Sequence, residues 1–423
     1  MSQRLVLFAK TILTMDRPEP IEDGFVLIQG SRVLQVGKRE DLYFTPSVRM
    51  LDLGDTLLLP GFINAHCHLD FTMFKGKVKY GGGFREWLRQ MAVKSRETTP
   101  SEFRKSIQKG IKQSLVFGTT TLCDVASSWE SYPLLRKSVL RSFVFFEMFD
   151  MAQPSTEQYW KNFQQSLKSL LRQVPPTDTC GWGLSPHTPF TVSKELFQLV
   201  KQFLNHHRDI LTTIHVGESR EESQYFKKGS GPMADRIKVL NPNWTIPRST
   251  TPVQYLSQNG WMPKLDMGVH LNEVDAKDLK SLAKNRIAVV HCPGSHAYFS
   301  HKLFPYKQMK KMKIPVCLGT DSLASNQSLS LFREMRLFKK KYPEVSSQEV
   351  LSMVTVKPAQ ALDRGGELGR VKPGYLADFI GVPMPQSKNE KQNLYDYVVN
   401  YKKHVSFSMI NGEPKLRLAE TPR

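Results

Sequence analysis

The sequence predicts an α/β fold: a (β/α)8 barrel together with a small β-sandwich that both ends of the chain build. Eight apolar, β-rich segments alternate with segments of helical periodicity in the middle of the chain. Shorter β-rich segments with Gly, Asp and Pro turns precede and follow this alternation. We therefore expect residues 59–361 to form the barrel, and residues 1–58 with 362–423 to form the composite sandwich.

The elements follow in order along the chain. Strand patterns open it at 5–15, 24–37 and 50–61, and helical spacing of apolar residues first appears after Gly81. The eight barrel strands are expected at 57–71, 119–126, 142–150, 180–187, 209–218, 265–272, 287–293 and 314–322. Helices are expected between most of them, at 84–97, 101–118, 155–173, 194–207 and 275–285, with a last one around 347–362. Alternating apolar residues return at 367–382 and 404–415.

The amino-acid composition limits the partners and the cellular compartment that we expect for the protein. The formal net charge is +20, but the basic residues are dispersed, so we expect a small-molecule substrate and no nucleic-acid or membrane partner. The five cysteines include no Cys-x-x-Cys pair, which favours a reducing compartment over a disulfide framework. The first residues are too polar for a secretory signal, and no segment approaches the length of a membrane span. These observations indicate a cytoplasmic protein.

Histidine or aspartate ends six of the eight expected strands, although the chain has only 11 histidines. The positions are His66 with His68, His187, His215, His270, His291 and Asp321. Functional residues of an α/β barrel lie at these strand ends. His66 and His68 are two residues apart, so both can face the barrel mouth.

These residue types point to metal-assisted hydrolysis. His66, His68, His215 and Asp321 would supply three nitrogens and one oxygen, which suits zinc and also suits iron or manganese. Such an ion lowers the pKa of a bound water and makes hydroxide available. Glu218 can shuttle a proton from the water to the leaving group, His270 can hold or polarise the attacked centre, and Asp321 can accept the proton of the attacking water.

Other residues have simpler interpretations. His291 is as well explained by packing in an apolar strand as by ligation. Asp378 lies in the β-rich tail and is interpreted as a turn residue. Cys67 stands between the two histidines, should face away from them, and is expected in the core.

The motifs resemble the amidohydrolase superfamily, in its cytosine deaminase and chlorohydrolase branch. They are "PGFINAHCH", "SPHTPFTVS", "HVGES", "VVHCPGS" and "LGTDSLASN", in the family's order. The resemblance implies a distorted (β/α)8 barrel and a single divalent ion, because the fourth strand has no lysine to bridge a second one. It assigns the same ligands, gives Glu218 the proton shuttle, and implies that His270 touches water and substrate. It adds His187 as a substrate contact, and we also expect substrate contacts from Asp70 and Ser295.

Within that branch, residues 81–88, 249–262 and 318–336 are most similar to aminodeoxyfutalosine deaminases. These enzymes remove the amino group of an adenine-type ring on the futalosine route to menaquinone. Asp70 stands where relatives often have Glu, and His296 stands where Asn is usual. Both departures bear on which substrate the protein binds and not on the type of reaction that it catalyses.

Three hypotheses follow. The leading one is hydrolytic deamination of an adenine-type nucleoside derivative. A second keeps the site but changes the substrate to adenosine, S-adenosylhomocysteine, methylthioadenosine, a guanine-type base or a chlorotriazine. A third is a non-catalytic scaffold or nucleic-acid-binding barrel, prompted by the charge. Arg85, Arg141 and Arg220 are candidates to meet a substrate carboxylate, and the resemblance is compatible with a homodimer.

Overall fold

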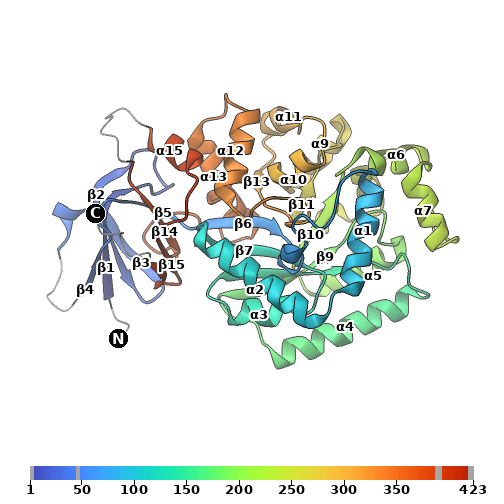
Figure 1. The fold of residues 1–423 in the computed structure, drawn as a ribbon, viewed down its shortest axis with the longest axis horizontal. Coiled ribbons are helices and arrows are strands. Elements are labelled where there is room, and N and C mark those ends of the chain that lie inside the picture. Colours follow the sequence, from blue (N-terminus) through green and yellow to red (C-terminus); the bar gives the residue numbers. More distant parts are fainter. Residues whose placement is uncertain (1–3, 44–47, 386–392, 418–423) are drawn as a thin grey trace.

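The structure is a computed structural model that describes residues 4–43, 48–385 and 393–417. It contains two sheets of eight strands each (Figure 1). One is a parallel barrel surrounded by helices, and the other is a smaller layer beside it that joins early and late segments of the chain. The predicted fold class is therefore confirmed.

All eight predicted barrel strands are present and in sequential order. They are β6 (Phe62–Cys67), β7 (Thr119–Ala126), β8 (Arg141–Met148), β9 (Cys180–Pro186), β10 (Leu211–Val216), β11 (Met267–His270), β12 (Ala288–His291) and β13 (Val316–Leu318). Every neighbouring pair along this order is parallel, so all carboxyl ends meet at one rim. A parallel bridge between Cys67 and Asp321 links the last strand to the first.

The second sheet combines both ends of the chain, as expected. Its strands are β1 (Arg4–Ile12), β2 (Ile21–Gln29), β3 (Arg32–Lys38), β4 (Arg49–Asp52), β5 (Thr56–Pro60), β14 (Phe379–Pro383), β15 (Phe407–Ile410) and β16 (Glu413–Arg417). Strand β5 pairs with β14 in antiparallel register, which joins the early and late segments. All barrel strands fall within 59–361, and the domain limits at 58/59 and 361/362 stay a prediction.

Gly61 separates two strands that the sequence pattern runs together. Residues 57–71 look like one strand, but β5 belongs to the terminal sheet and β6 opens the barrel. The backbone N–H of Gly61 donates to the carbonyl of Asp378. A β-carbon at Gly61 would lie 2.1 Å from Thr120 Oγ1, so the crossing between the sheets has no room for a side chain.

The helices cover the outside of the barrel (Figure 1). They are α1 (Phe84–Glu97), α2 (Pro100–Val116), α3 (Ser131–Lys137), α4 (Thr156–Gln173), α5 (Lys194–His206), α6 (Arg220–Lys228), α7 (Pro232–Leu240), α8 (Pro252–Gln258), α9 (Ala276–Lys284), α10 (Pro293–Tyr298), α11 (Tyr306–Lys311), α12 (Leu331–Lys341), α13 (Ser347–Ser352), α14 (Val356–Ala361) and α15 (Leu394–Asn400). Short 3-10 turns lie at η1 (Arg39–Asp41), η2 (Leu69–Phe74) and η3 (Met262–Lys264). No described helix is both long and apolar enough to cross a bilayer.

The last predicted helix is wrong in one respect. The segment 347–362 forms two short helices, α13 and α14, and not one. Thr355 breaks the helix with φ −131° and ψ −82°, while its hydroxyl donates to the carbonyl of Leu351. Pro358 near the start of α14 has no backbone N–H, a position that a helix tolerates only in its first turn. Helix α15 lies between the expected strand segments 367–382 and 404–415, where no helix was predicted, and packs on α12 and α13.

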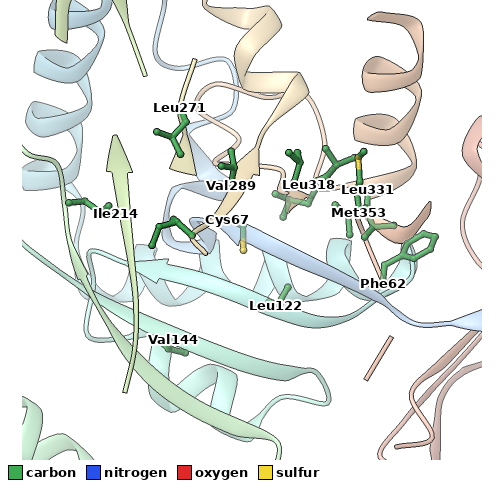
Figure 2. Packing of buried hydrophobic residues seen from close by; sticks show 14 of the residues in the cluster. Phe62, Cys67, Leu122, Val144, Ile214, Leu271, Val289, Leu318, Leu331 and Met353 are labelled. Carbon is green, nitrogen blue, oxygen red and sulfur yellow. The ribbon is translucent and has the colours of Figure 1, made fainter. Parts of the chain in front are cut away.

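Two apolar layers hold the barrel. The outer layer packs the strands against the helices, and Figure 2 labels several of its members, among them Leu122 of β7, Val144 of β8 and Leu331 of α12. An inner layer joins strand residues to one another, including Ile63, Val125, Phe145, Val269 and Val290. Because side chains alternate along a strand, the inner row of β8 continues from Phe145 to Glu147 at the rim.

A buried ion pair corrects two interpretations. The Arg141 guanidinium at the start of β8 donates to both carboxylate oxygens of Asp378, at 2.8 and 3.3 Å, and to the carbonyl of Asp178. Arg141 also donates to Asn411, and both charged side chains are less than 5% exposed. Asp378 is therefore more than a turn residue. Arg141 lies at the amino end of its strand, so it cannot meet a substrate at the opposite rim.

Candidate metal centre

The four candidate ligands converge at the carboxyl rim of the barrel. His66 and His68 come from β6, His215 from β10, and Asp321 follows β13. The Nε2 atoms of His68 and His215 are 3.2 Å apart. Asp321 Oδ1 lies 3.7 Å from His66 Nε2 and 3.8 Å from His68 Nε2. The ligand atoms of His66, His68 and Asp321 lie within 4.8 Å of one another and could hold a metal ion, and His215 adjoins this group through His68.

Backbone contacts between the first and last strands fix the relative position of His66 and Asp321. The N–H groups of Thr320 and Asp321 both donate to the carbonyl of His66, at 2.9 and 3.1 Å. Asp321 has φ 56°, a left-handed conformation that a non-glycine residue rarely adopts. Its carboxylate accepts from the backbone of Ser322 and from the hydroxyl of Ser325. Each oxygen of the carboxylate is thus held by a donor from the residues that directly follow Asp321.

The ring nitrogens of the three histidines differ in their hydrogen bonds, and His215 has the pattern of a metal ligand. His215 Nδ1 lies 3.0 Å from the carbonyl of His187, which fixes the proton on Nδ1 and leaves Nε2 as a lone pair. Both ring nitrogens of His66 and Nδ1 of His68 are buried without a hydrogen-bond partner among the described residues. Buried polar atoms are nearly always satisfied, so the unpaired Nε2 of His66, which faces Asp321, fits a site that accepts a cation.

The protonation states of the candidate ligands also suit the binding of a divalent ion. Burial, followed by the charge of His66, lowers the pKa of His68 to about 4 and that of His215 well below its usual range. Both imidazoles are therefore neutral at pH 7, the state in which imidazole binds metal. Burial acts to raise the pKa of Asp321, but His66 and His270 outweigh it and hold that pKa well below its ordinary value. The set offers neutral nitrogens and one carboxylate.

Glu218 and His270 form a second pair beside the ligands. Glu218 Oε2 lies 3.6 Å from His270 Nε2, and both side chains are nearly buried. Burial, with the nearby charges of Asp321 and Glu222, raises the pKa of Glu218 well above its usual value. Burial lowers the pKa of His270 to about 3. The pKa of Glu218 is raised and the pKa of Asp321 is lowered. Opposite shifts of two neighbouring carboxyl groups are expected where one acts as a general acid and the other as a general base.

The loop that carries Glu218 is held by a buried carboxylate. Glu222, on the first turn of α6, accepts from the backbone of Gly217 at 3.0 Å and from the backbone of Glu218 at 2.7 Å. The amide of Asn272 donates to the carbonyl of Glu218. His270 has φ 73°, so the end of β11 is also strained. The backbone of Glu218 is therefore held by helix α6 and by the segment that follows β11.

The three expected substrate contacts differ in their surroundings. His187 is one-quarter exposed, and its Nδ1 lies 2.9 Å from Thr191 Oγ1. Ser295, on α10, is buried, and its hydroxyl has no hydrogen-bond partner in the described part of the chain. Asp70 is fully buried, and one of its oxygens accepts from the backbone of Ser127 and Ser128. Its other oxygen has no partner among the described residues.

The residues with simpler interpretations lie outside the cluster. His291 stacks on Phe304 with ring centroids 3.9 Å apart, as a packed histidine does. The Cys67 thiol points towards the carbonyl of Cys123 and is fully buried. Arg85 and Arg220 start α1 and α6 near the rim, where Glu221 accepts from the backbone of Phe84 and Arg85.

Sequence reasoning missed Glu147. This residue ends the inner row of β8, and its Oε1 lies within 4.0 Å of nitrogens of both His187 and His215. The signal in the sequence is a single charged residue inside the otherwise apolar run "FVFFEMF". A buried charge in an apolar strand is rare unless it has a partner or a role.

Comparisons with known proteins define the class. The Amidohydrolase family matches residues 57–414, which cover the barrel and the return to the terminal sheet. The chain belongs to this family, whose members are metal-dependent hydrolases. The resemblance seen in the motifs is thereby confirmed.

Three individual proteins show what this chain is similar to within the family. A 5-methylthioadenosine/S-adenosylhomocysteine deaminase of Pyrococcus furiosus is 28% identical over 370 residues, which are 84% of this chain and 80% of that protein. The Helicobacter pylori aminofutalosine deaminase in complex with methylthio-coformycin matches with a TM-score of 0.85 at 22% identity, covering 97% of this chain and 100% of that one. A Xanthomonas campestris adenosine deaminase with bound zinc matches with a TM-score of 0.83 at 21% identity, covering 99% and 94%.

Proposed function

We propose that the protein is a hydrolytic deaminase of an adenine-type nucleoside derivative and that it uses one divalent ion, zinc being the ion best suited. The observation that supports the proposal is a cluster of buried histidines and Asp321 at the barrel rim beside Glu218, a buried carboxyl group whose pKa is raised. Hydrolysis of a carbon–nitrogen bond needs a nucleophile and a proton for the departing nitrogen. The two parts of the site supply these separately.

The ligands we assign to the ion are His66, His68, His215 and Asp321. Three imidazoles and a single carboxylate fit zinc in a site that keeps an open position. When bound there, a divalent ion lowers the pKa of water and so supplies a nucleophile at neutral pH.

The chain's own residues then move protons. Burial raises the pKa of Glu218 and so favours its protonated form, which can donate to a ring nitrogen and afterwards carry a proton to the leaving ammonia. Asp321 is ionised, and it can accept the proton of the attacking water. His270, neutral and 3.6 Å from Glu218, is placed to hold the attacked centre.

The substrate class rests on the relatives and on the motifs. The P. furiosus relative is named for two adenine nucleosides, and the H. pylori protein for aminofutalosine. The resemblance of residues 318–336 to aminodeoxyfutalosine deaminases favours that compound, and with it a place in menaquinone synthesis. We also infer a cytoplasmic enzyme that acts on a small molecule. A panel of aminodeoxyfutalosine, methylthioadenosine, S-adenosylhomocysteine, adenosine, guanine and cytosine would rank the candidates.

Replacing Glu218 tests the mechanism. Glu218→Gln keeps the shape of the side chain but removes the transferable proton, so ammonia release should fall by about 10²- to 10⁴-fold. Zinc content should remain stoichiometric because Glu218 is not among the proposed ligands. The control is Glu195→Gln, an exposed carboxylate on α5, which should leave the rate unchanged. Undiminished ammonia release by Glu218→Gln would contradict the assigned role.

A further inference from the structure

Glu147 carries a carboxylate oxygen that the protein itself does not use. The side chain is 6% exposed. Its Oε2 accepts a hydrogen bond from the hydroxyl of Ser127. Its Oε1 is buried and has no hydrogen-bond partner among the described residues. Burying a carboxylate oxygen away from water costs free energy unless a hydrogen-bond donor replaces the water. The unpaired Oε1 atom therefore suggests that a bound ligand supplies this donor.

The surroundings of Oε1 exclude a second metal ion as that ligand. Oε1 lies 4.0 Å from His187 Nε2 and 3.9 Å from His215 Nδ1, a grouping that could in principle surround a cation. However, His215 Nδ1 is committed to the carbonyl of His187 and therefore carries a proton. A protonated nitrogen cannot ligate, which leaves only two usable groups at this position. The oxygen is thus available to accept hydrogen bonds from a molecule in the barrel mouth.

The position of Glu147 in the barrel indicates which part of a substrate it meets. Glu218 follows β10 and His270 ends β11, so the amino-bearing ring lies towards that side of the rim. Glu147 ends β8, two strands away, beyond His187 and His215. Phe149 follows it with 45% of its surface exposed and its ring centroid 5.9 Å from that of His187. An acceptor next to an exposed aromatic ring suits a sugar, which offers hydroxyl donors on its edge and carbon atoms on its faces.

We propose that Glu147 positions the sugar of the nucleoside substrate by accepting hydrogen bonds from its vicinal hydroxyls. This inference rests on the proposed function, because it takes the substrate to be an adenine-type nucleoside. Ser127 acts through Glu147 by holding the second carboxylate oxygen. Glu147 is a specificity-determining residue, since the groups that transfer protons lie elsewhere.

The test compares nucleosides that differ only in their hydroxyls. The probes are adenosine, 2′-deoxyadenosine, 3′-deoxyadenosine and 2′,3′-dideoxyadenosine, or the matching series of whichever adenine nucleoside the parent enzyme prefers. Hydrogen bonds to a charged acceptor imply that the parent favours the diol by about 10- to 100-fold in kcat/KM. In Glu147→Ala this preference should fall to within about threefold, while kcat/KM for the dideoxy compound should stay near the parent value.

Two further variants keep the result interpretable. Ser127→Ala should give a preference between those of the parent and Glu147→Ala, because the carboxylate remains but loses its anchor. Glu157→Gln removes an exposed charge on α4 and should preserve the parent preference. Zinc content should be stoichiometric in all variants.

The outcomes separate the two proposals. If the parent deaminates adenine nucleosides but Glu147→Ala keeps the full diol preference, the role of Glu147 is wrong and the proposed function stands. An equal loss for the dideoxy compound, or loss of zinc, would also overturn it, since either would show a general effect on the site. If the parent deaminates no adenine nucleoside, both proposals fall together.

Discussion

At the level of single residues, ion affinity should depend on hydrogen bonds from side chains that do not touch the ion. Ser325 donates to Asp321 Oδ2 at 2.9 Å and so orients the oxygen that faces the histidines. Outer partners of this kind are worth about 10- to 100-fold in metal affinity. Ser325→Ala should therefore weaken zinc binding by about 10-fold, measured by chelator competition.

The control for this experiment is Ser169→Ala, on the exposed face of α4. It makes the same chemical change far from the cluster and should bind zinc like the parent. Asp321→Asn removes the charged ligand itself and should weaken binding by more than Ser325→Ala does. Equal affinity in the parent and in Asp321→Asn would show that the ion is held elsewhere.

Glu334 gives the stability of the protein a pH dependence. It is fully buried, and burial raises its pKa to about 7 from the ordinary 4.5, although the amide of Asn326 and the backbone of Gly294 donate to it. The folded state therefore binds a proton more tightly than the unfolded state. This contribution to the free energy of unfolding is full below pH 4.5 and is lost as the pH rises through 7.

The corresponding variant is Glu334→Gln, which stays neutral at every pH. The free energy of unfolding of the parent relative to this variant should fall by on the order of 2 kcal/mol between pH 5 and 7.5. Urea unfolding of the zinc-loaded proteins measures it, with the exposed Glu195→Gln expected to run parallel to the parent. A difference that does not change with pH would refute the assignment.

Single residues also show what the sequence could predict. The common position of His66, His68, His215 and Asp321 at one rim was predictable because they end apolar strands, and parallel strands bring such ends together. Glu147 was missed because a lone charge in a strand says nothing about which neighbours it will meet. Arg141 and Asp378 were misjudged because their pairing joins positions 237 residues apart.

At the level of elements, the contact between the first and last barrel strands determines the site. Gly319 follows β13 and packs directly on β6: a β-carbon there would lie 2.8 Å from the carbonyl oxygen of His66 and 2.9 Å from its nitrogen. Both are backbone atoms that cannot turn aside. Gly319→Ala should push the strands apart and so separate His66 from Asp321.

We expect Gly319→Ala to lower zinc affinity and ammonia release together, as measured by metal analysis and by activity at saturating zinc. Gly366→Ala is the matched control, because nothing lies within 4 Å of the added carbon. If Gly319→Ala binds zinc like Gly366→Ala, the strand contact does not govern the site.

The elements themselves were largely predictable, since periodicity of 3.6 or 2 residues is a local property. Helix α4 follows its predicted span closely, with the Ser155 hydroxyl capping its first turn. The break between α13 and α14 was missed because apolar spacing continues across Thr355. The division of residues 57–67 between two sheets was missed because it depends on a contact between Gly61 and a distant strand.

At the level of the whole molecule, the ion pair of Arg141 and Asp378 joins the amino end of the barrel to the terminal sheet. Arg141→Met would leave the Asp378 carboxylate buried without a cation. Breaking a buried pair in this way costs about 3–5 kcal/mol. We expect the unfolding free energy in urea to fall by about that amount.

The double variant Arg141→Met with Asp378→Leu removes both charges and should recover much of the lost stability, because no uncompensated charge remains. Zinc content of the folded protein should be unchanged, since the pair lies at the opposite end of the barrel from the rim. A loss below about 1 kcal/mol in Arg141→Met would contradict the structural role of the pair.

The central claim is that four side chains far apart in the sequence hold one ion. Anomalous diffraction at the zinc edge, from crystals of the zinc-loaded protein, tests it most directly. The account predicts one strong peak at the barrel rim, about 2.0–2.2 Å from nitrogens of His66, His68 and His215 and from an oxygen of Asp321. A peak elsewhere, or any of the four side chains turned away from it, would contradict the claim.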